Sequence, residues 1–354
     1  MTTVTPLTLG LDLGDTHTEI CCLDAKGHLV ERGRISTGRE SLAALFQRYP
    51  NATKVFEVGS QSRWVQQLAK ASGPGEVIAA DPRQLHLISK SCRKNDRKDA
   101  FLLCRAGQGL PELLHPVEHR SEQAHLDLQV LRTRETLVGQ RTELVNRIRG
   151  IVKSTGARLP KCDAKYFFRK ARPYVPEAVL PACAPLFAIL AALHEQLLEL
   201  KKQIRAMSTR YPAAERLAQV PSVGELTALT FVLTIDDPGR IRGCRNAGAY
   251  LGLTPKTRES GDSSPQLRIT KAGDTRLRRL LVLCAHYLLS RGKDCRLKRW
   301  GLELCRRGGR NAKKRAVIAV ARKLSVQLLS IWRSGEDYDP WRDASPELLD
   351  TASA

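Results

Sequence analysis

The feature that most restricts how this 354-residue chain can fold is a long helical pattern that begins near residue 119. From His119 to Thr155 there is no proline, and apolar residues recur near helical spacing with Arg and Glu between them. This stretch predicts one long helix, and 186–207 predicts a second. The two are joined by a proline-rich connection. The pair is therefore expected to form a helical hairpin or coiled-coil arm, used for dimerisation or for contact with nucleic acid.

The residues before this pattern are organised differently. Short β-prone runs at 7–13, 19–24 and 28–35 predict three consecutive strands. Further strands are predicted at 54–58 and 77–80, with helical segments between and after them. Such an order predicts an α/β sheet of mixed strand direction.

The pattern as a whole predicts several domains, since a domain typically has about 100–200 residues. The expected divisions are an α/β domain at 1–110, the helical arm at 111–210, a mainly helical domain at 211–340 and a disordered tail at 341–354.

Basic residues are concentrated in the last third of the chain. The whole sequence has 58 Lys and Arg against 36 Asp and Glu, a net charge of +22. Residues 239–334 alone contain 24 basic and 5 acidic residues, a net charge of +19. A charge excess this localised indicates a polyanionic partner, and nucleic acid before membrane.

Other features bear on the compartment. No apolar run approaches the roughly 18 residues expected of a membrane span, and the N-terminus does not have the pattern of a signal peptide. The ten cysteines include no C-x-x-C pair, which argues against structural zinc. We therefore expect a cytoplasmic protein without a membrane partner.

Four carboxylates stand out by their order and surroundings. Asp12 lies in the first predicted strand, Glu57 ends a later one, and Asp96 and Asp99 are spaced to share one face of a helix. Carboxylate oxygens suit Mg²⁺ or Mn²⁺, and two such ions clamp the attacking and leaving oxygens of a phosphodiester. The basic neighbours expected to draw the nucleic-acid backbone to this site are Arg93, Lys94, Arg97 and Lys98.

Basic and turn features in the C-terminal third fit the same substrate. The P-S-V-G turn at 221–224 precedes an apolar helix and resembles a helix-hairpin-helix element, whose exposed N–H groups suit a phosphate. Two amphipathic helices are predicted at 275–290 and 310–332 with basic outer faces. The residues expected to contact nucleic acid are Lys271, Arg276, Arg278, Arg279, Lys313, Lys314 and Arg315.

Several motifs resemble one known family over about residues 7–335. D-L-G at 12–14, F-E-V-G around Glu57 and K-N-D-R-K-D-A at 94–100 are similar to the RuvC-like, RNase H-type domain of the DEDD transposases. These are insertion-sequence recombinases guided by a bridge RNA, and pilin-gene invertases are their relatives. The segments 247–264 and 268–281 resemble that family's second conserved domain.

The resemblance implies a fold and a reaction. The fold would be an α/β RNase H-like (RuvC-like) N-terminal domain, a long helical coiled-coil arm and a mainly α-helical C-terminal domain. The enzyme would cleave and rejoin DNA strands with metal-bound carboxylates and a serine nucleophile, which the R-E-S-G motif identifies as Ser260, with Ser263 and Ser264 as rivals. The implied partners are DNA, a structured guide RNA, and further copies of the chain in a homodimer or homotetramer.

Three alternatives remain open at this level. A RuvC-like, structure-selective endonuclease would use the same acids with water as the nucleophile. The sequence D-L-G-D-T, which includes Asp15, is also similar to the phosphate-binding motif of sugar kinases and actin-like ATPases, but no second phosphate loop follows. A basic nucleic-acid-binding scaffold without activity is the third.

Overall fold

The computed structural model of the chain describes residues 6–83, 85, 96–258, 265 and 267–342, without the side chain of Asp96. The chain divides into two compact units, Met1–His119 (unit 1) and Arg120–Ala354 (unit 2). Of the predicted tail at 341–354, only the first two residues lie within the described part.

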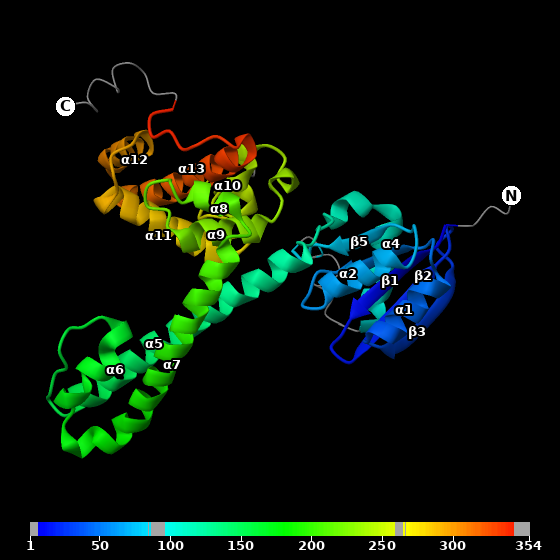
Figure 1. Cartoon of the computed structure of the whole chain (residues 1–354). Coiled ribbons are helices and arrows are strands. Elements are labelled where there is room, and N and C mark those ends of the chain that lie inside the picture. The colour runs from blue at the N-terminus through cyan, green and yellow to red at the C-terminus, as the bar shows by residue number, and fades with distance from the viewer. Residues whose placement is uncertain (1–5, 84, 86–95, 259–264, 266, 343–354) are drawn as a thin grey trace. The chain divides into compact units, whose positions relative to one another are not determined.

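Unit 1 is built on a five-stranded sheet of mixed direction (Figure 1). Its elements are β1 (Thr8–Leu13), β2 (His17–Leu23), β3 (Leu29–Ser36), α1 (Arg39–Arg48), β4 (Thr53–Glu57), α2 (Ser62–Ala71), β5 (Val77–Ala80), α4 (Asp96–Gly109) and the 3-10 turn η1 (Pro111–Leu114). The strand order is β3-β2-β1-β4-β5. The first three strands are antiparallel, whereas β4 and β5 run parallel to β1. This arrangement is compatible with the expected RNase H-like domain.

Helices cover both faces of this sheet. Alternate residues such as Leu9 and Leu11 pack with α1 and α2 on one face, because side chains along a strand alternate between faces. On the other face, α4 packs Ala100 and Cys104 against β2. The helix α4 approaches β1 closely, since a Cβ atom on Gly10 of β1 would lie 2.2 Å from the carbonyl oxygen of Ala100 in α4. Glycine at this position therefore lets α4 lie directly against β1.

Unit 2 is helical apart from one β-bridge in its described part (Figure 1). Its α-helices are α5 (Glu122–Ser154), α6 (Phe167–Lys170), α7 (Leu180–Ser208), α8 (Pro212–Leu217), α9 (Glu225–Ile235), α10 (Ala247–Tyr250), α11 (Thr275–Arg291), α12 (Arg296–Arg306) and α13 (Ala312–Ser334). Short 3-10 turns lie at Ala164–Tyr166, Arg172–Tyr174, Glu177–Val179, Pro238–Arg240 and Cys244–Asn246. The mainly helical C-terminal region expected from the sequence is confirmed.

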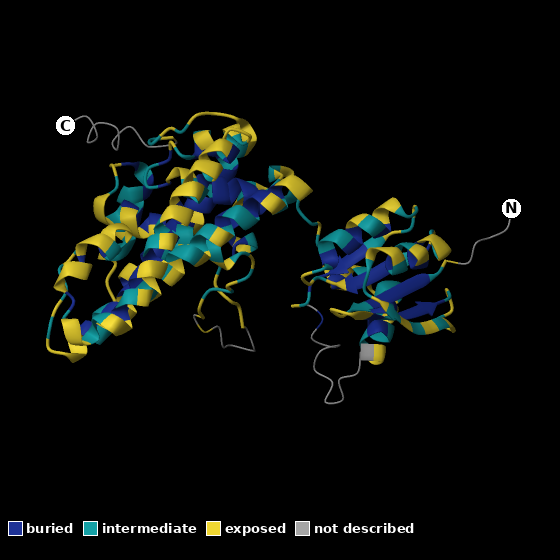
Figure 2. Cartoon of the chain, turned by 60° about the horizontal axis from the view of Figure 1, so that its bottom comes forward, coloured by how far each residue is buried: buried dark blue, intermediate teal, exposed yellow. Residues whose placement is uncertain are grey.

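The helix α5 contributes to two separate hydrophobic cores. Its first turns place Leu128 and Leu131 in a large core with α9, α11 and α13. Its last turns place Ile148 and Val152 in a second core with Phe187 and other residues of α6 and α7. One continuous helix therefore supports both the C-terminal core and the far end of the helix pair. Figure 2 shows buried and exposed residues alternating along the long helices of unit 2.

A buried carboxylate ties α5 to the end of α7. Asp127 accepts hydrogen bonds from the Arg210 guanidinium at 2.7 and 2.8 Å and from the Tyr211 hydroxyl at 2.5 Å. Gln123 donates a further bond at 3.0 Å. Because a buried charge is stable only when it is paired and hydrogen-bonded, this cluster fixes the base of the helix pair.

The segment Glu177–Ser208, which includes α7, contains an 18-residue window with a mean hydropathy of 1.7 and is long and apolar enough to cross a membrane. A helix at 186–207 was expected from the sequence, but an apolar stretch of this length was not. In the structure, Cys183, Phe187 and Leu190 of this segment pack into the core shared with α5. Only 22% of the apolar window is buried within the described residues, so this helix is a candidate span by length and composition alone. The coiled-coil character of the pair stays a prediction.

Candidate functional site

The strand register brings two of the predicted acids to one place in unit 1. Asp12 follows Gly10 on the face of β1 that α4 covers, since residues two apart share a face. On the neighbouring parallel strand Gly10 pairs with Val55, so Glu57 lies on that same face. Both carboxylates thus belong to the carboxyl ends of adjacent parallel strands.

The helix α4 carries the other two acids toward this edge. It runs antiparallel to β1: the Cys104 thiol donates to the carbonyl oxygen of Thr8 at 3.0 Å, and Ala100 contacts Gly10. Its first turn, with the half-buried Asp99, therefore lies toward the end of β1 where Asp12 is found. Asp96 is the first residue of α4, but its side chain lies outside the described residues.

The described residues contain no group of three or more His, Cys, Asp or Glu side chains able to hold a metal ion. The side chain of Asp96, one member of the predicted set, is not among the described residues. All four members of the set are carboxylates, which are the ligands that Mg²⁺ and Mn²⁺ prefer. Metal binding by Asp12, Glu57, Asp96 and Asp99 therefore fits the chemistry of this edge and stays a prediction.

A fifth acid, which the sequence analysis did not single out, lies at the same edge. Glu19 of β2 pairs directly with Asp12 across the antiparallel ladder. Its half-buried carboxylate lies 3.5 Å from the Arg34 guanidinium and 3.9 Å from that of Arg97. Arg97 is in the first turn of α4, so Glu19 links β2 to the segment that carries Asp96 and Asp99. Pairing the two strands outward from the tight turn at 14–16 places Glu19 opposite Asp12, so the sequence held a signal for this residue.

In unit 2 a narrow hairpin holds the segment with the predicted nucleophile. Pro255 and Ile269 form an isolated antiparallel bridge. The backbone N–H of Lys256 donates to the Arg268 carbonyl at 2.9 Å, and that of Thr270 donates to the Thr254 carbonyl at 2.9 Å. Ser260, Ser263 and Ser264 belong to the connection between these two arms and lie outside the described residues.

Arg278 was expected on the outer face of its helix, where it would contact nucleic acid, but the structure buries it. It is 8% exposed. One guanidinium nitrogen donates to the carbonyl oxygens of Leu251 at 3.1 Å and Ala272 at 2.6 Å, and the other donates to the Thr275 hydroxyl at 3.0 Å. Leu251 and Ala272 lie on opposite arms at the base of the hairpin. Arg278 is therefore an internal brace of the hairpin.

Other predicted contact residues have different surroundings. Arg276 and Arg279 both form ion pairs with Glu135 of α5, the first at 3.3 Å. The exposed members are Arg97, Lys98, Lys271, Arg279, Lys313, Lys314 and Arg315, while Arg93 and Lys94 lie outside the described residues. Nothing in these contacts tests binding of nucleic acid, which stays a prediction for the exposed residues.

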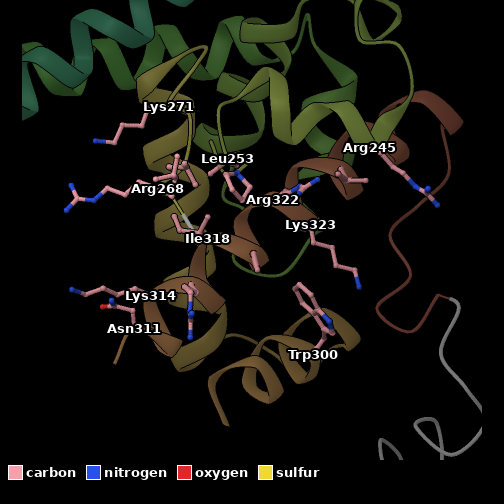
Figure 3. Close-up of a pocket in the computed structure, with 16 residues that line it drawn as sticks. Arg245, Leu253, Arg268, Lys271, Trp300, Asn311, Lys314, Ile318, Arg322 and Lys323 are labelled. Carbon is pink, nitrogen blue, oxygen red and sulfur yellow. The ribbon is translucent and has the colours of Figure 1, made fainter. Parts of the chain in front are cut away.

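A cavity of about 980 Å³ opens beside the hairpin, between its arms and the helices α12 and α13 (Figure 3). Its lining is Arg245, Leu253, Pro255, Leu267, Arg268, Ile269, Lys271, Trp300, Asn311, Lys314, Arg315, Ile318, Ala319, Arg322, Lys323 and Val326. This set, called the basic groove below, includes seven cationic side chains and, among the described residues, no acidic one. Three of the seven, Lys271, Lys314 and Arg315, are among the residues expected from the sequence to contact nucleic acid.

Two family models match the chain, and together they cover both candidate regions. One, for DEDD transposases of the IS110 type, matches residues 9–156. The other, described as the transposase IS116/IS110/IS902 family, matches residues 214–300. The first match includes Asp12, Glu57 and Asp99, and the second includes the hairpin.

Curated relatives align along most of the chain. The transposase for insertion sequence element IS1111A of Coxiella burnetii is 26% identical over 343 residues, which cover 93% of this chain and 90% of the relative. A putative transposase of Sinorhizobium fredii is 28% identical, covering 93% and 85%. The transposase for insertion sequence element IS1328 of Yersinia enterocolitica is 27% identical, covering 80% and 84%.

Proposed function

Because the chain belongs to the IS110/IS116 family of DEDD transposases, which implies DNA cleavage and strand transfer, we propose that Asp12, Glu57, Asp96 and Asp99 form its metal-binding active site. The observation that carries this proposal is the shared position of Asp12 and Glu57 at the carboxyl ends of adjacent parallel strands, on the face covered by α4. The first turn of that helix supplies the other two acids.

The acids would hold Mg²⁺ or Mn²⁺, and the bound metal would stabilise charge that develops on the scissile phosphate. The chain's own contribution is to fix the carboxylates in one place. Asp12 and Glu57 are carried by rigid neighbouring strands, and Gly10 allows α4 to approach them closely. Glu19 would hold the first turn of α4 through Arg97, which makes it a positioning residue.

Ser260 is the proposed nucleophile. Its hydroxyl oxygen would form a bond to phosphorus while the bond to the leaving DNA oxygen breaks, and the serine proton would end on the departing hydroxyl. A second DNA hydroxyl would then attack the phosphoserine, release the serine and restore a phosphodiester. Rejoining needs no ATP, since the covalent link retains the energy of the original bond. The support is the R-E-S-G motif at 258–261 within the family resemblance.

The remaining parts of the proposal concern partners. We expect the enzyme to be cytoplasmic, to act with a structured guide RNA, and to work as a homodimer or homotetramer. Sequencing the nucleic acid that copurifies with the expressed protein tests the RNA. A discrete structured RNA from the element's flank supports guidance, and random host RNA counts against it.

A recombination assay in cells tests the acidic site. Glu57→Gln is expected to lower recombination by at least about 100-fold, since a metal ligand contributes several kcal/mol to transition-state stabilisation. Glu40→Gln is the matched control, because Glu40 is an exposed acid on α1, which covers the opposite face of the sheet. Equal activity of the two variants would contradict the proposed site.

A trapped protein–DNA adduct distinguishes serine from water as the nucleophile. The intact enzyme is expected to form a covalent adduct with DNA that is absent in Ser260→Ala. An adduct that persists in Ser260→Ala but is lost in Ser263→Ala or Ser264→Ala would move the role to a neighbouring serine. Cleavage without any adduct would instead favour the RuvC-like endonuclease.

A further inference from the structure

The basic groove combines charge and apolar surface in a regular way. Along α13, Lys314, Ile318, Arg322 and Val326 occur every fourth residue, so cationic and apolar side chains alternate on one stripe. The opposite wall comes from the hairpin arms, which contribute Leu253, Pro255 and Ile269 together with Arg268 and Lys271. Figure 3 shows Arg268, Lys271 and Lys314 extending to one side of this lining.

The electrostatics of the groove favour a polyanion. Seven cationic side chains line it without an acidic one among the described residues. Burial, and then the charge of Arg296, lower the pKa of Lys323 on its wall. Neighbouring cations in a partly dehydrated site repel one another, and an anion that contacts several of them at once, such as a phosphate backbone, relieves this repulsion most.

The apolar surface restricts which nucleic acid fits. A duplex keeps the flat faces of its bases stacked inside, so its outer surface offers phosphates and sugars to a protein. It would leave the partly exposed side chains of Ile269, Ile318 and Val326 without an apolar partner. An unpaired strand presents base faces, which bury well against apolar and aromatic side chains.

Trp300 provides an aromatic surface at one side of the groove. Its ring is half-buried, and the Lys323 ammonium lies 4.5 Å from the ring centroid (Figure 3). An aromatic ring next to a cation is the combination with which single-strand-binding proteins hold a base and its phosphate. The volume of about 980 Å³ is at the upper end of the roughly 300–1,000 Å³ found for ligand pockets.

We propose that the basic groove binds an unpaired strand of DNA or RNA, with the bases on its apolar surface and Trp300 and the phosphates on its cations. The inference rests on the proposed function for its context, since strand transfer requires a strand to leave its partner. Binding itself needs no metal and no nucleophile. A measurement made in EDTA therefore separates failure of this proposal from failure of the active-site proposal.

The test is fluorescence anisotropy with the full-length protein and labelled strands of about 16 nucleotides, the upper site size of known single-strand folds. The probes are oligo-dT, oligo-U, an abasic strand of equal charge and a duplex of equal length. The base-bearing strands are expected to bind at least about fivefold more tightly than the abasic strand, since stacking contributes about 1–3 kcal/mol per base. Tighter binding of oligo-dT or of oligo-U identifies the strand that the groove takes, and either supports the proposal.

Two substitutions locate the binding in the groove. Lys314→Ser is expected to reduce the slope of log affinity against log salt by about 0.7, the value for one phosphate contact in a single strand. Lys293→Ser is the control: Lys293 is an exposed lysine between α11 and α12 that does not line the groove. Trp300→Leu keeps an apolar side chain against the core and should remove most of the preference for bases over the abasic strand.

Thermal unfolding of each variant verifies that it is folded. The proposal is overturned if the wild-type protein binds the duplex or the abasic strand as tightly as the base-bearing strands, a comparison that needs no variant. It is also overturned if Lys293→Ser and Lys314→Ser have the same effect on the salt dependence.

Discussion

Substituting Arg278 by Met tests whether this arginine braces the hairpin. The substitution keeps a long unbranched side chain but removes every donor. The carbonyl oxygens of Leu251 and Ala272 then lose the hydrogen bonds they receive in a site that is 8% exposed. An unsatisfied buried carbonyl costs about 1–3 kcal/mol, so two cost about 2–6 kcal/mol. Removing a buried charge offsets part of this, and we expect a net loss of about 3 kcal/mol.

Urea unfolding followed by tryptophan fluorescence measures the loss, because three of the four tryptophans, Trp300, Trp332 and Trp341, are in unit 2. The urea midpoint of Arg278→Met should fall by about 1 M or more. Arg279→Met is the control. Arg279 is the next residue, its side chain is 60% exposed, and its loss should change stability by less than about 1 kcal/mol. Equal urea midpoints for Arg278→Met and Arg279→Met would refute the interpretation of Arg278 as a brace of the hairpin.

Two further predictions concern buried charges. Burial raises the pKa of Asp127, but hydrogen bonds from Arg210, Tyr211 and Gln123 outweigh it and hold that pKa below its usual value. The contribution of Asp127 to the free energy of unfolding is therefore present above about pH 4 and lost as the pH falls through the folded-state pKa. Asp127→Asn should make the free energy of unfolding in urea less dependent on pH in this acidic range. An unchanged pH dependence would contradict the prediction. Burial lowers the pKa of Lys54. Among the contacts described, its ammonium donates a hydrogen bond only to the Pro50 carbonyl oxygen, which also accepts one from the Gly75 N–H. Lys54→Met should therefore stabilise unit 1 by about 1–2 kcal/mol at pH 7, with the gain vanishing as the pH rises toward 10.5; a loss of stability at pH 7 would contradict this.

Elements with a distinct local composition or a clear helical period could be predicted from the sequence. The first three strands are short β-prone runs, and the helices α5, α7, α11 and α13 have apolar stripes long enough to be recognised. The helix α12 was missed, because four of its eleven residues are basic and one is a glycine. In the structure that glycine is required: a Cβ atom on Gly301 would lie 2.6 Å from Val320 and 2.7 Å from Leu289. Close packing between distant segments is not visible in a local pattern.

The errors at the candidate site have a similar origin. Arg278 was assigned to the outer face by its charge, although it precedes Leu281 by three residues and Ala285 by seven and so shares their buried stripe. Spacing carried the correct signal there. Glu19 needed the pairing register as well, since only the turn at 14–16 places it opposite Asp12. The brace at the base of the hairpin depended on Leu251 and Ala272, which are more than twenty residues apart along the chain.

The continuous course of α5 through two cores sets a rule for how its length can change. One inserted residue rotates everything beyond it by about 100°, because an α-helix has 3.6 residues per turn. Such an insertion between Leu131 and Val145 would turn Ile148 and Val152 away from Phe187 while the first turns stayed in place. Seven inserted residues would restore the orientation to within about 20°. Seven residues also lengthen the helix by about 10.5 Å, so α7 would need a matching insertion to keep Phe187 in contact. Natural variation in the length of this helix should therefore occur in steps of about seven residues that are matched in α7, which aligned relatives can reveal without any experiment on the protein.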